Sequence, residues 1–262
     1  MNRLVLAIMV SLIINATSSL AAPAGLAHAG TLRATFIATN PVQGVTDPAT
    51  GEVRGPAAEL SREIGRRLGV PVKVTGAPGV LASVKNGEAD IGFLAYDPAR
   101  AAEVDYSQTY SLAQNTFAVL DNSPLKSVAD IDRAGMRIGV TEGDTGDLYL
   151  TRTLKNAAFW RNKDGNTELA VNMLRTGEIH AYGTNRQRLY DLARRNPGLR
   201  LLPDNFYGVP QAIVVSKGNK ALLEIVDRML DETRSSGLTA AAIARAGLVG
   251  VDVAPPGPRR TR

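Results

Sequence analysis

The stretch ADIGFLAYDPARAAEVDYSQTY, residues 89–110, carries the strongest structural signal in the sequence. Its first half is a short apolar run that follows Gly87, which is typical of a buried strand. The pair Asp97-Pro98 can then cap and begin a helix, with Arg100 in its first turn. A helix N-terminus carries partial positive charge and disfavours an arginine unless an anion comes to meet it. The stretch therefore predicts a strand, a helix start and a place for a bound anion.

Strands and helices alternate on both sides of this stretch. Before it, hydrophobic patterns and turn residues predict a strand at 31–38, a turn-rich hairpin or loop at 43–55, an amphipathic helix at 57–68, a strand at 70–74 and a short helix at 80–87. After it, they predict helices at 127–135, 148–154, 166–177, 186–196, 222–235 and 238–246, with strands at 136–140, 178–183 and 211–219. The same strand-then-helix order in both halves predicts an α/β fold with two mainly parallel sheets flanked by helices. Ligands of such sheets bind at the carboxyl ends of the strands.

The two ends of the chain differ from the body. Asn2 and Arg3 precede an apolar run at 4–14, and Ala27-His28-Ala29 is an A-x-A cleavage site, with a cut after Ala21 as an alternative. These features predict a signal peptide over residues 1–29 and a periplasmic location. At the other end, the Pro- and Arg-rich residues 251–262 are expected to form a disordered basic tail without an assigned function.

Composition and charge exclude several classes of function. The formal net charge is +5, but Arg3 lies in the leader and Arg259, Arg260 and Arg262 lie in the tail, so the body carries about one positive charge. Together with 5% aromatic residues, this argues against a nucleic-acid partner. The absence of cysteine excludes disulfides and thiolate metal sites. Neither a cofactor nor a metal is expected.

Four segments resemble the extracellular solute-binding proteins of amino-acid ABC importers, family 3. They are "NGEADIG" at 86–92, "DPARAAEVDYSQTY" at 97–110, "MRIGVTEGDTGDLYL" at 136–150 and "TGEIHAYGTN" at 176–185. The second matches the family pattern over many consecutive positions, and all four come in the family's order. The resemblance implies a type II periplasmic binding fold of two lobes, which closes on a small solute and passes it to a membrane permease. A monomer is expected.

The resemblance also implies the ligand contacts. In the family, the arginine that matches Arg100 grips the ligand's carboxylate, the turn that matches Gly143 to Thr145 donates to the same group, and an acid at the position of Asn185 takes the ammonium. These roles suit a planar guanidinium fork and a helix start with free N–H groups. The expected ligand-binding residues are Asn40, Tyr96, Arg100, Gly143, Thr145 and Asn185.

Three departures from the family pattern concern the other end of the ligand. Asn185 is neutral, so the usual salt bridge to an ammonium is missing. Val42 replaces a common aromatic residue, and the loop at 90–98 is about two residues shorter and brings in Tyr96. The expected ligand is therefore a small carboxylate-bearing solute, an amino acid or a related compound, whose ammonium group is left open.

The two lobes are expected to exchange strands. Residues 30–112 and 210–250 should form the first lobe and residues 113–209 the second, with crossings near 111–115 and 207–211. Arg100 and Thr145 should then face the same gap from opposite lobes.

Structural roles compete with these binding roles. Arg100 could balance Asp97 or Glu103 on the surface, and Tyr96 could cover the core at the end of a strand. Asn185 could serve as a helix N-cap. Asp144 and Asp147 are natural cap and turn residues, so a metal site is not expected there.

Two other classes of function remain as alternatives. A dehydratase-like enzyme on the same fold would need an acid or base from Glu142, Asp144 or His180. No nucleophile with a histidine partner forms a known motif, and the chain is not expected to be an enzyme. A ligand-sensing module for a membrane partner is the remaining alternative.

Overall fold

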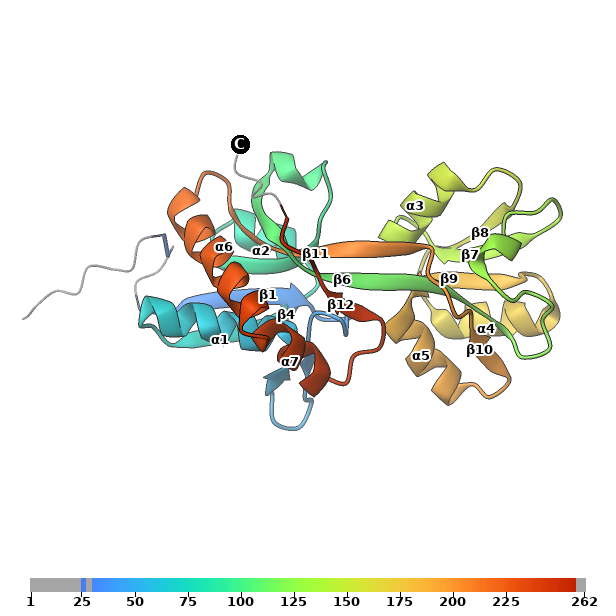
Figure 1. The fold of residues 1–262 in the computed structure, drawn as a ribbon, viewed down its shortest axis with the longest axis horizontal. Helices are drawn as coiled ribbons and strands as arrows, with labels where there is room; N and C mark the ends of the chain where they lie inside the picture. Colours follow the sequence, from blue (N-terminus) through green and yellow to red (C-terminus); the bar gives the residue numbers. More distant parts are fainter. Residues whose placement is uncertain (1–24, 27–29, 258–262) are drawn as a thin grey trace, which may run out of the picture.

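The computed structural model describes residues 25–26 and 30–257 and forms two groups of helices and strands joined by two long strands (Figure 1). Most of the predicted signal peptide lies outside the described residues, so the structure does not test it. Within the described ranges, no helix has both the length and the apolar character needed to cross a membrane.

The first group is built on three parallel strands. β1 (Leu32–Ile37) lies between β4 (Val72–Ala77) and β5 (Ile91–Ala95). The helices of this group are α1 (Pro56–Leu68), α2 (Val80–Lys85), α6 (Lys220–Ser235) and α7 (Leu238–Arg245). The apolar face of α1 is buried as its spacing predicts, because Leu60 and Ile64 recur one turn apart and pack on the core around Phe36 and Phe93. The expected hairpin is also present, as β2 (Val45–Thr46) and β3 (Val53–Arg54).

The second group repeats this plan. β7 (Arg137–Thr141) lies between β8 (Ala158–Asn162) and β9 (Ala181–Asn185), and all three strands are parallel. Its helices are α3 (Thr145–Thr153), α4 (Thr167–Thr176) and α5 (Arg186–Arg195). The sequence pattern missed β8, because that strand is largely exposed and lacks a continuous apolar run.

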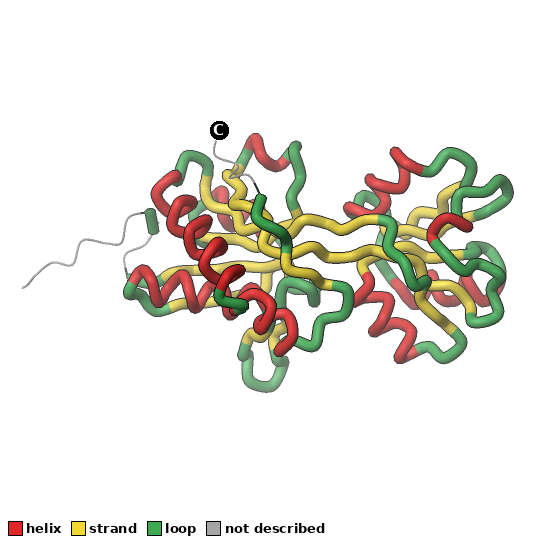
Figure 2. The backbone as a smooth tube through the Cα atoms, in the orientation of Figure 1, coloured by secondary structure: helices red, strands yellow, loops and turns green. Residues whose placement is uncertain are grey.

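Two long antiparallel strands connect the groups. β6 (Val104–Leu120) and β11 (Tyr207–Ser216) pair from Tyr207 opposite Asn115 to Ser216 opposite Val104. β11 also pairs with β5, and β6 also pairs with β9, so the hydrogen-bonded order is β4-β1-β5-β11-β6-β9-β7-β8. The long strands run between the two groups in Figure 2. The α/β class and its parallel strands are confirmed. The two expected sheets are joined into one continuous sheet, because β11 pairs with β5 of the first group and β6 pairs with β9 of the second.

The helix expected after Asp97-Pro98 is a single 3-10 turn, η1 (Arg100–Ala102). It ends because β6 begins at Val104. The helix expected at 127–135 is likewise one 3-10 turn, η2 (Val128–Asp130), closed by a capping box between Ser127 and Asp130.

The tail prediction is wrong for its first residues. Val251–Val253 form β12, which pairs antiparallel with β6 at Ser111 to Ala113. This pairing extends by one further hydrogen bond, which the Gln114 N–H donates to the Gly250 carbonyl. The strand is ordered because β6 offers unpaired backbone groups there and because Val251 is buried. A further short strand, β10 (Leu199–Leu201), pairs with the far end of β6.

A buried carboxylate links β1 to the start of β5. The Asp90 side chain is fully buried and accepts from the Arg33 backbone N–H at 2.8 Å and from its guanidinium at 3.0 and 3.2 Å. Lys85 and Glu103 form an ion pair too, but on the surface.

These two ion pairs predict contrasting effects on stability. Asp90→Ala should lower the free energy of unfolding by about 2–4 kcal/mol, because it leaves buried donors of Arg33 without their acceptor. Glu103→Ala should cost less than about 1 kcal/mol, since its pair with Lys85 is exposed. Urea unfolding followed by circular dichroism measures both, and equal effects would contradict this assignment.

Candidate functional site

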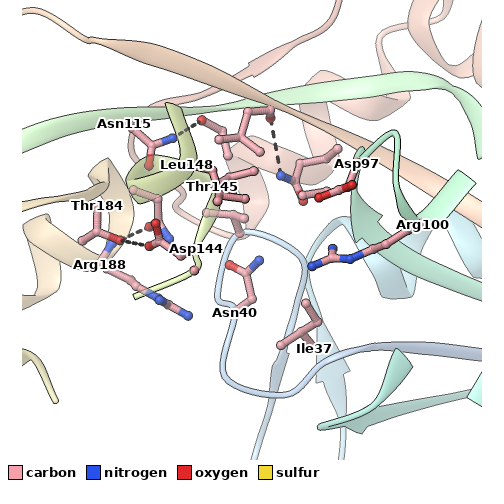
Figure 3. A pocket seen from close by; sticks show the side chains of 17 residues that line it. Ile37, Asn40, Asp97, Arg100, Asn115, Asp144, Thr145, Leu148, Thr184 and Arg188 are labelled. Atoms are coloured by element: carbon pink, nitrogen blue, oxygen red, sulfur yellow. Dashed lines mark hydrogen bonds between the residues drawn. The ribbon is translucent and has the colours of Figure 1, made fainter. Parts of the chain in front are cut away.

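A cavity of about 180 Å³ lies between the two groups, beside the crossing strands (Figure 3). Its lining residues come from the loop after β1, the end of β5, η1, the middle of β6 and β11, the N-terminus of α3 and the β9–α5 junction. They are Ile37, Asn40, Val42, Ala95, Asp97, Arg100, Ala113, Asn115, Gly143, Asp144, Thr145, Leu148, Thr184, Asn185, Arg188, Val209 and Gln211. The carboxyl ends of β1, β5, β7 and β9 thus all open onto this space, as expected for parallel α/β sheets.

Arg100 projects into the cavity from η1 (Figure 3). The Asp97 carboxylate accepts from the Ala99 N–H at 2.7 Å, and Glu103 pairs with Lys85. Neither acid forms an ion pair with Arg100, and no other ion pair of Arg100 occurs in the described part of the chain. The surface-pairing alternative is therefore not what the structure shows.

The neighbouring Tyr106 holds this region in place. Its hydroxyl donates to the Ala95 carbonyl at 3.2 Å. Burial raises the pKa of Tyr106, and Arg100 opposes this shift by its charge and by a hydrogen bond to the hydroxyl. Arg100 is thus oriented by a neutral group and keeps its charge available to the cavity.

A glutamine pair fixes the loop that carries Asn40. The buried Gln43 accepts from the Ile37 N–H at 3.0 Å and donates to Gln211 of β11 at 3.1 Å. Asn40 points into the cavity, and its Oδ1 atom is buried without a hydrogen-bond partner among the described residues (Figure 3). Buried amide oxygens normally have a donor, so a water or a ligand group is expected to donate to it.

The turn at Gly143 to Thr145 begins α3. Gly143 has a φ of +73°, a conformation that favours glycine, and its N–H donates to the Asp147 carboxylate at 3.0 Å. The Asp144 N–H donates to the Thr141 carbonyl at 3.2 Å. Thr145, in contrast, has neither its N–H nor its hydroxyl engaged within the described ranges. Of the three residues in this turn, Thr145 keeps donors that can reach a ligand.

Asp144 caps α3 at the edge of the cavity. Its carboxylate accepts from the Asp147 N–H at 2.8 Å and lies 3.5 Å from the Thr184 hydroxyl. Burial raises the pKa of Asp144, against the opposing effects of the helix N–H groups and of the Arg188 charge. The carboxylate is thus already occupied by the helix start that it caps.

Asn185 and Arg188 lie one turn apart at the start of α5. The Asn185 side chain is the N-cap of this helix and accepts from the Arg188 N–H at 2.8 Å. Because residues three apart share a helix face, Arg188 lines the cavity together with Asn185. Its guanidinium donates to the Thr39 carbonyl at 3.2 Å, which joins α5 to the loop after β1.

The structure brings five of the six expected site residues to this cavity. They are Asn40, Arg100, Gly143, Thr145 and Asn185. Tyr96 is not among the lining residues. It packs edge-on against Tyr106, with ring centroids 5.2 Å apart, and lies against the core of the first group.

The sequence pattern missed Arg188, Asn115 and Gln211, which also line the cavity. Arg188 could have been found from its helical spacing to Asn185, whereas the other two lie in strands without a distinctive motif. Among the described residues, no three His, Cys, Asp or Glu side chains come together in a way that could hold a metal.

Two α/β groups that face one polar cavity, joined by two crossing strands, define a two-lobed solute-binding protein with the type II fold. The sequence matches the bacterial extracellular solute-binding proteins, family 3, over residues 32–246, and the chain belongs to this family. The predicted resemblance is therefore confirmed.

The curated relatives and solved structures agree with this family. The ABC transporter glutamine-binding protein GlnH of Bacillus subtilis (strain 168) is 24% identical over 201 residues, which cover 74% of this chain and 72% of that protein. The glutamine-binding protein of Geobacillus stearothermophilus is 24% identical over 184 residues, covering 68% and 69%. An ancestral arginine-binding protein with bound arginine is 27% identical, with a TM-score of 0.65 over 82% of this chain and 97% of that one. These relatives are binding proteins, not enzymes.

The capping role of Asp144 predicts a pH effect on stability. Folding raises the pKa of the Asp144 carboxyl group above 3.8, so the ionised group lowers the free energy of unfolding at pH values above the folded pKa. Below pH 3.8 the group is protonated in both states, and this cost is absent. Asn caps helices as well as Asp does. Asp144→Asn should therefore unfold at a higher urea concentration than the parent at pH 7, and this advantage should disappear as the pH falls below about 3.8.

Asp130→Asn is the control, and its urea midpoint should change with pH in the opposite direction. The backbone N–H groups of Lys126 and Ser127 lower the pKa of Asp130, so its carboxylate stabilises the fold above pH 3.8 and loses this effect as the pH falls. A pH series of urea midpoints compares the two variants, and parallel pH trends would contradict the environment assigned to Asp144.

Proposed function

We propose that this protein is the periplasmic substrate-binding component of an ABC importer, which binds a small carboxylate-bearing solute in the cavity between its lobes. Residues 1–29 act as the export signal. Residues 30–112 with 210–250 form one lobe and residues 113–209 the other, and β12 belongs with the crossing strands. A membrane permease of the transporter receives the solute, and the binding protein acts as a monomer.

One observation carries this proposal: Arg100 and the Thr145 helix start face the same cavity from the two different groups. Arg100 offers a planar guanidinium fork that matches a carboxylate, and Thr145 offers an unpaired N–H and hydroxyl at the positive end of α3. A carboxylate between them would meet donors from both lobes at once. The Asn40 side-chain nitrogen, which has no hydrogen-bond partner among the described residues, can donate a further hydrogen bond.

Ligand binding at this place would favour the closed arrangement of the lobes. A solute that touches both groups has more contacts when they are close together, so it shifts the population toward closure by its difference in affinity. The cavity is smaller than the roughly 300–1,000 Å³ typical of drug-sized ligands, which fits a solute of a few heavy atoms.

None of the three residues named for the dehydratase alternative is available at the cavity as an acid or base. Glu142 and His180 do not line it, and the His180 Nδ1 atom accepts from the Arg137 N–H. Asp144 is engaged as a helix cap. This arrangement agrees with the binding role of the relatives.

Removal of the Arg100 side chain tests the site. In isothermal titration, Arg100→Ala should weaken the best-bound carboxylate by about 2–4 kcal/mol, at least ~30-fold in Kd, because the ligand anion loses a charge-assisted partner in a partly buried site. Arg175→Ala is the matched control, since Arg175 is exposed in the last turn of α4 and lines no part of the cavity. Unchanged affinity in Arg100→Ala would remove Arg100 from the binding site.

A further inference from the structure

The cavity has a second cation at the end away from Arg100. Arg188 extends from α5 past Asn40, on the side opposite Arg100 (Figure 3). Its single described hydrogen bond goes to a neutral carbonyl, that of Thr39, and it forms no ion pair with any described residue. Four of the five guanidinium N–H donors thus have no described partner.

The groups around Arg188 do not supply the acid that an ammonium needs. Asn185 is neutral, and its side-chain oxygen already accepts from the Arg188 N–H. Asp144 attracts Arg188 through space, but its carboxylate is used by the N-terminus of α3 and by Thr184. An ammonium placed here would meet a guanidinium of like charge, and the other carboxylate of the cavity, Asp97, lies on the Arg100 side (Figure 3). Burying an ammonium beside Arg188 would therefore be costly.

The space beyond Arg188 carries as many basic as acidic side chains. Arg188 separates the binding cavity from a second, more polar cavity of about 510 Å³. The charged residues that line this second cavity are Lys163, Asp164, Arg188, Asp191 and Arg195. Asp191 accepts from the Gln187 amide, and Arg195 has Glu168 at 3.8 Å. These side chains therefore do not cancel the positive charge that Arg188 brings to its end of the cavity.

Given the proposed function, on which this inference rests, we propose that the ligand is a small dicarboxylate, or a comparable acid with a second anionic group, and that it needs no ammonium. One carboxylate binds to Arg100 and Thr145, and the second binds to Arg188. The Arg188 guanidinium is then a specificity-determining group, and it connects the second anion of the ligand to the loop of the first group through Thr39.

The first experiment compares ligands that differ in the second charge. Isothermal titration of the mature protein with the straight-chain dicarboxylates from malonate to adipate identifies the best length. The monoamide of that acid keeps its size and one carboxylate but loses the second charge. We expect the dicarboxylate to bind at least ~10-fold more tightly than its monoamide and than glutamine or arginine, as losing one charge-assisted pair predicts.

Two variants of α5 test whether Arg188 and Asn185 cause this difference in affinity. Arg188→Gln should weaken the dicarboxylate at least ~10-fold and leave its monoamide nearly unchanged, because the two ligands differ in the group that Arg188 contacts. Asn185→Asp keeps the helix cap but restores a carboxylate. It should weaken the dicarboxylate and strengthen glutamine or arginine. Arg194→Gln is the control, since Arg194 lies exposed on the same helix and lines neither cavity.

The outcomes separate this inference from the proposed function. Glutamine or arginine binding more tightly than every dicarboxylate, or equal affinity of the dicarboxylate for parent and Arg188→Gln, would overturn the inference while leaving the carboxylate site at Arg100 in place. Binding of none of these carboxylates would overturn the proposed function and the inference together.

Discussion

The antiparallel pairing of β6 with β11 is the constraint on which the rest of the molecule depends. Between Leu112 and Gln114, β6 has β11 on one side, while β5 pairs with β11 and β9 pairs with β6 only beyond this segment. The two groups are thus attached to one another through a few backbone hydrogen bonds, the small apolar cluster around Val42, Val209 and Val251, and polar contacts such as that of Arg188 with Thr39. A narrow connection of this kind leaves the groups able to move as units, and β12 adds a third strand to it.

This connection also decides where charges meet. α3 and α5 begin at the edge of one sheet, and η1 and the loop after β1 lie at the edge of the other, so polar groups from both edges project into one small space. Two arginines enter it from opposite sides, and each is held by neutral groups, Arg100 by Tyr106 and Arg188 by Thr39. Cations positioned by neutral partners keep their attraction for an anion, which supports the proposed anionic ligand.

Buried polar links hold the binding loops without filling the cavity. The Gln43–Gln211 pair fastens the Asn40 loop to β11, and Asp147 fastens the Gly143 turn while pairing with Arg161 on β8. Such links leave Asn40 and Thr145 with unused hydrogen-bonding groups. The site is therefore organised before a ligand arrives, which lowers the entropy that binding must overcome.

The sequence by itself determined the α/β class, the family and most of the helices and strands, because apolar periodicity and turn residues are local signals. It also placed Arg100 and Thr145 at two strand ends, and the motif order suggested that these ends face each other. It missed the exposed strand β8 and the ordered strand β12, since neither has a strong apolar pattern of its own and each is formed by pairing with a neighbour distant in the sequence.

Only the tertiary structure decided which side chains share the cavity. Tyr96 packs toward the core against Tyr106, whereas Arg188, one turn after the N-cap Asn185, lines the cavity. Both outcomes depend on how separate elements pack at the crossing strands, and a linear pattern does not encode that packing. The position of Arg100 and Thr145 at the cavity could thus be predicted from sequence, whereas the charge at the other end of the cavity became visible only when α5 was placed opposite the loop after β1.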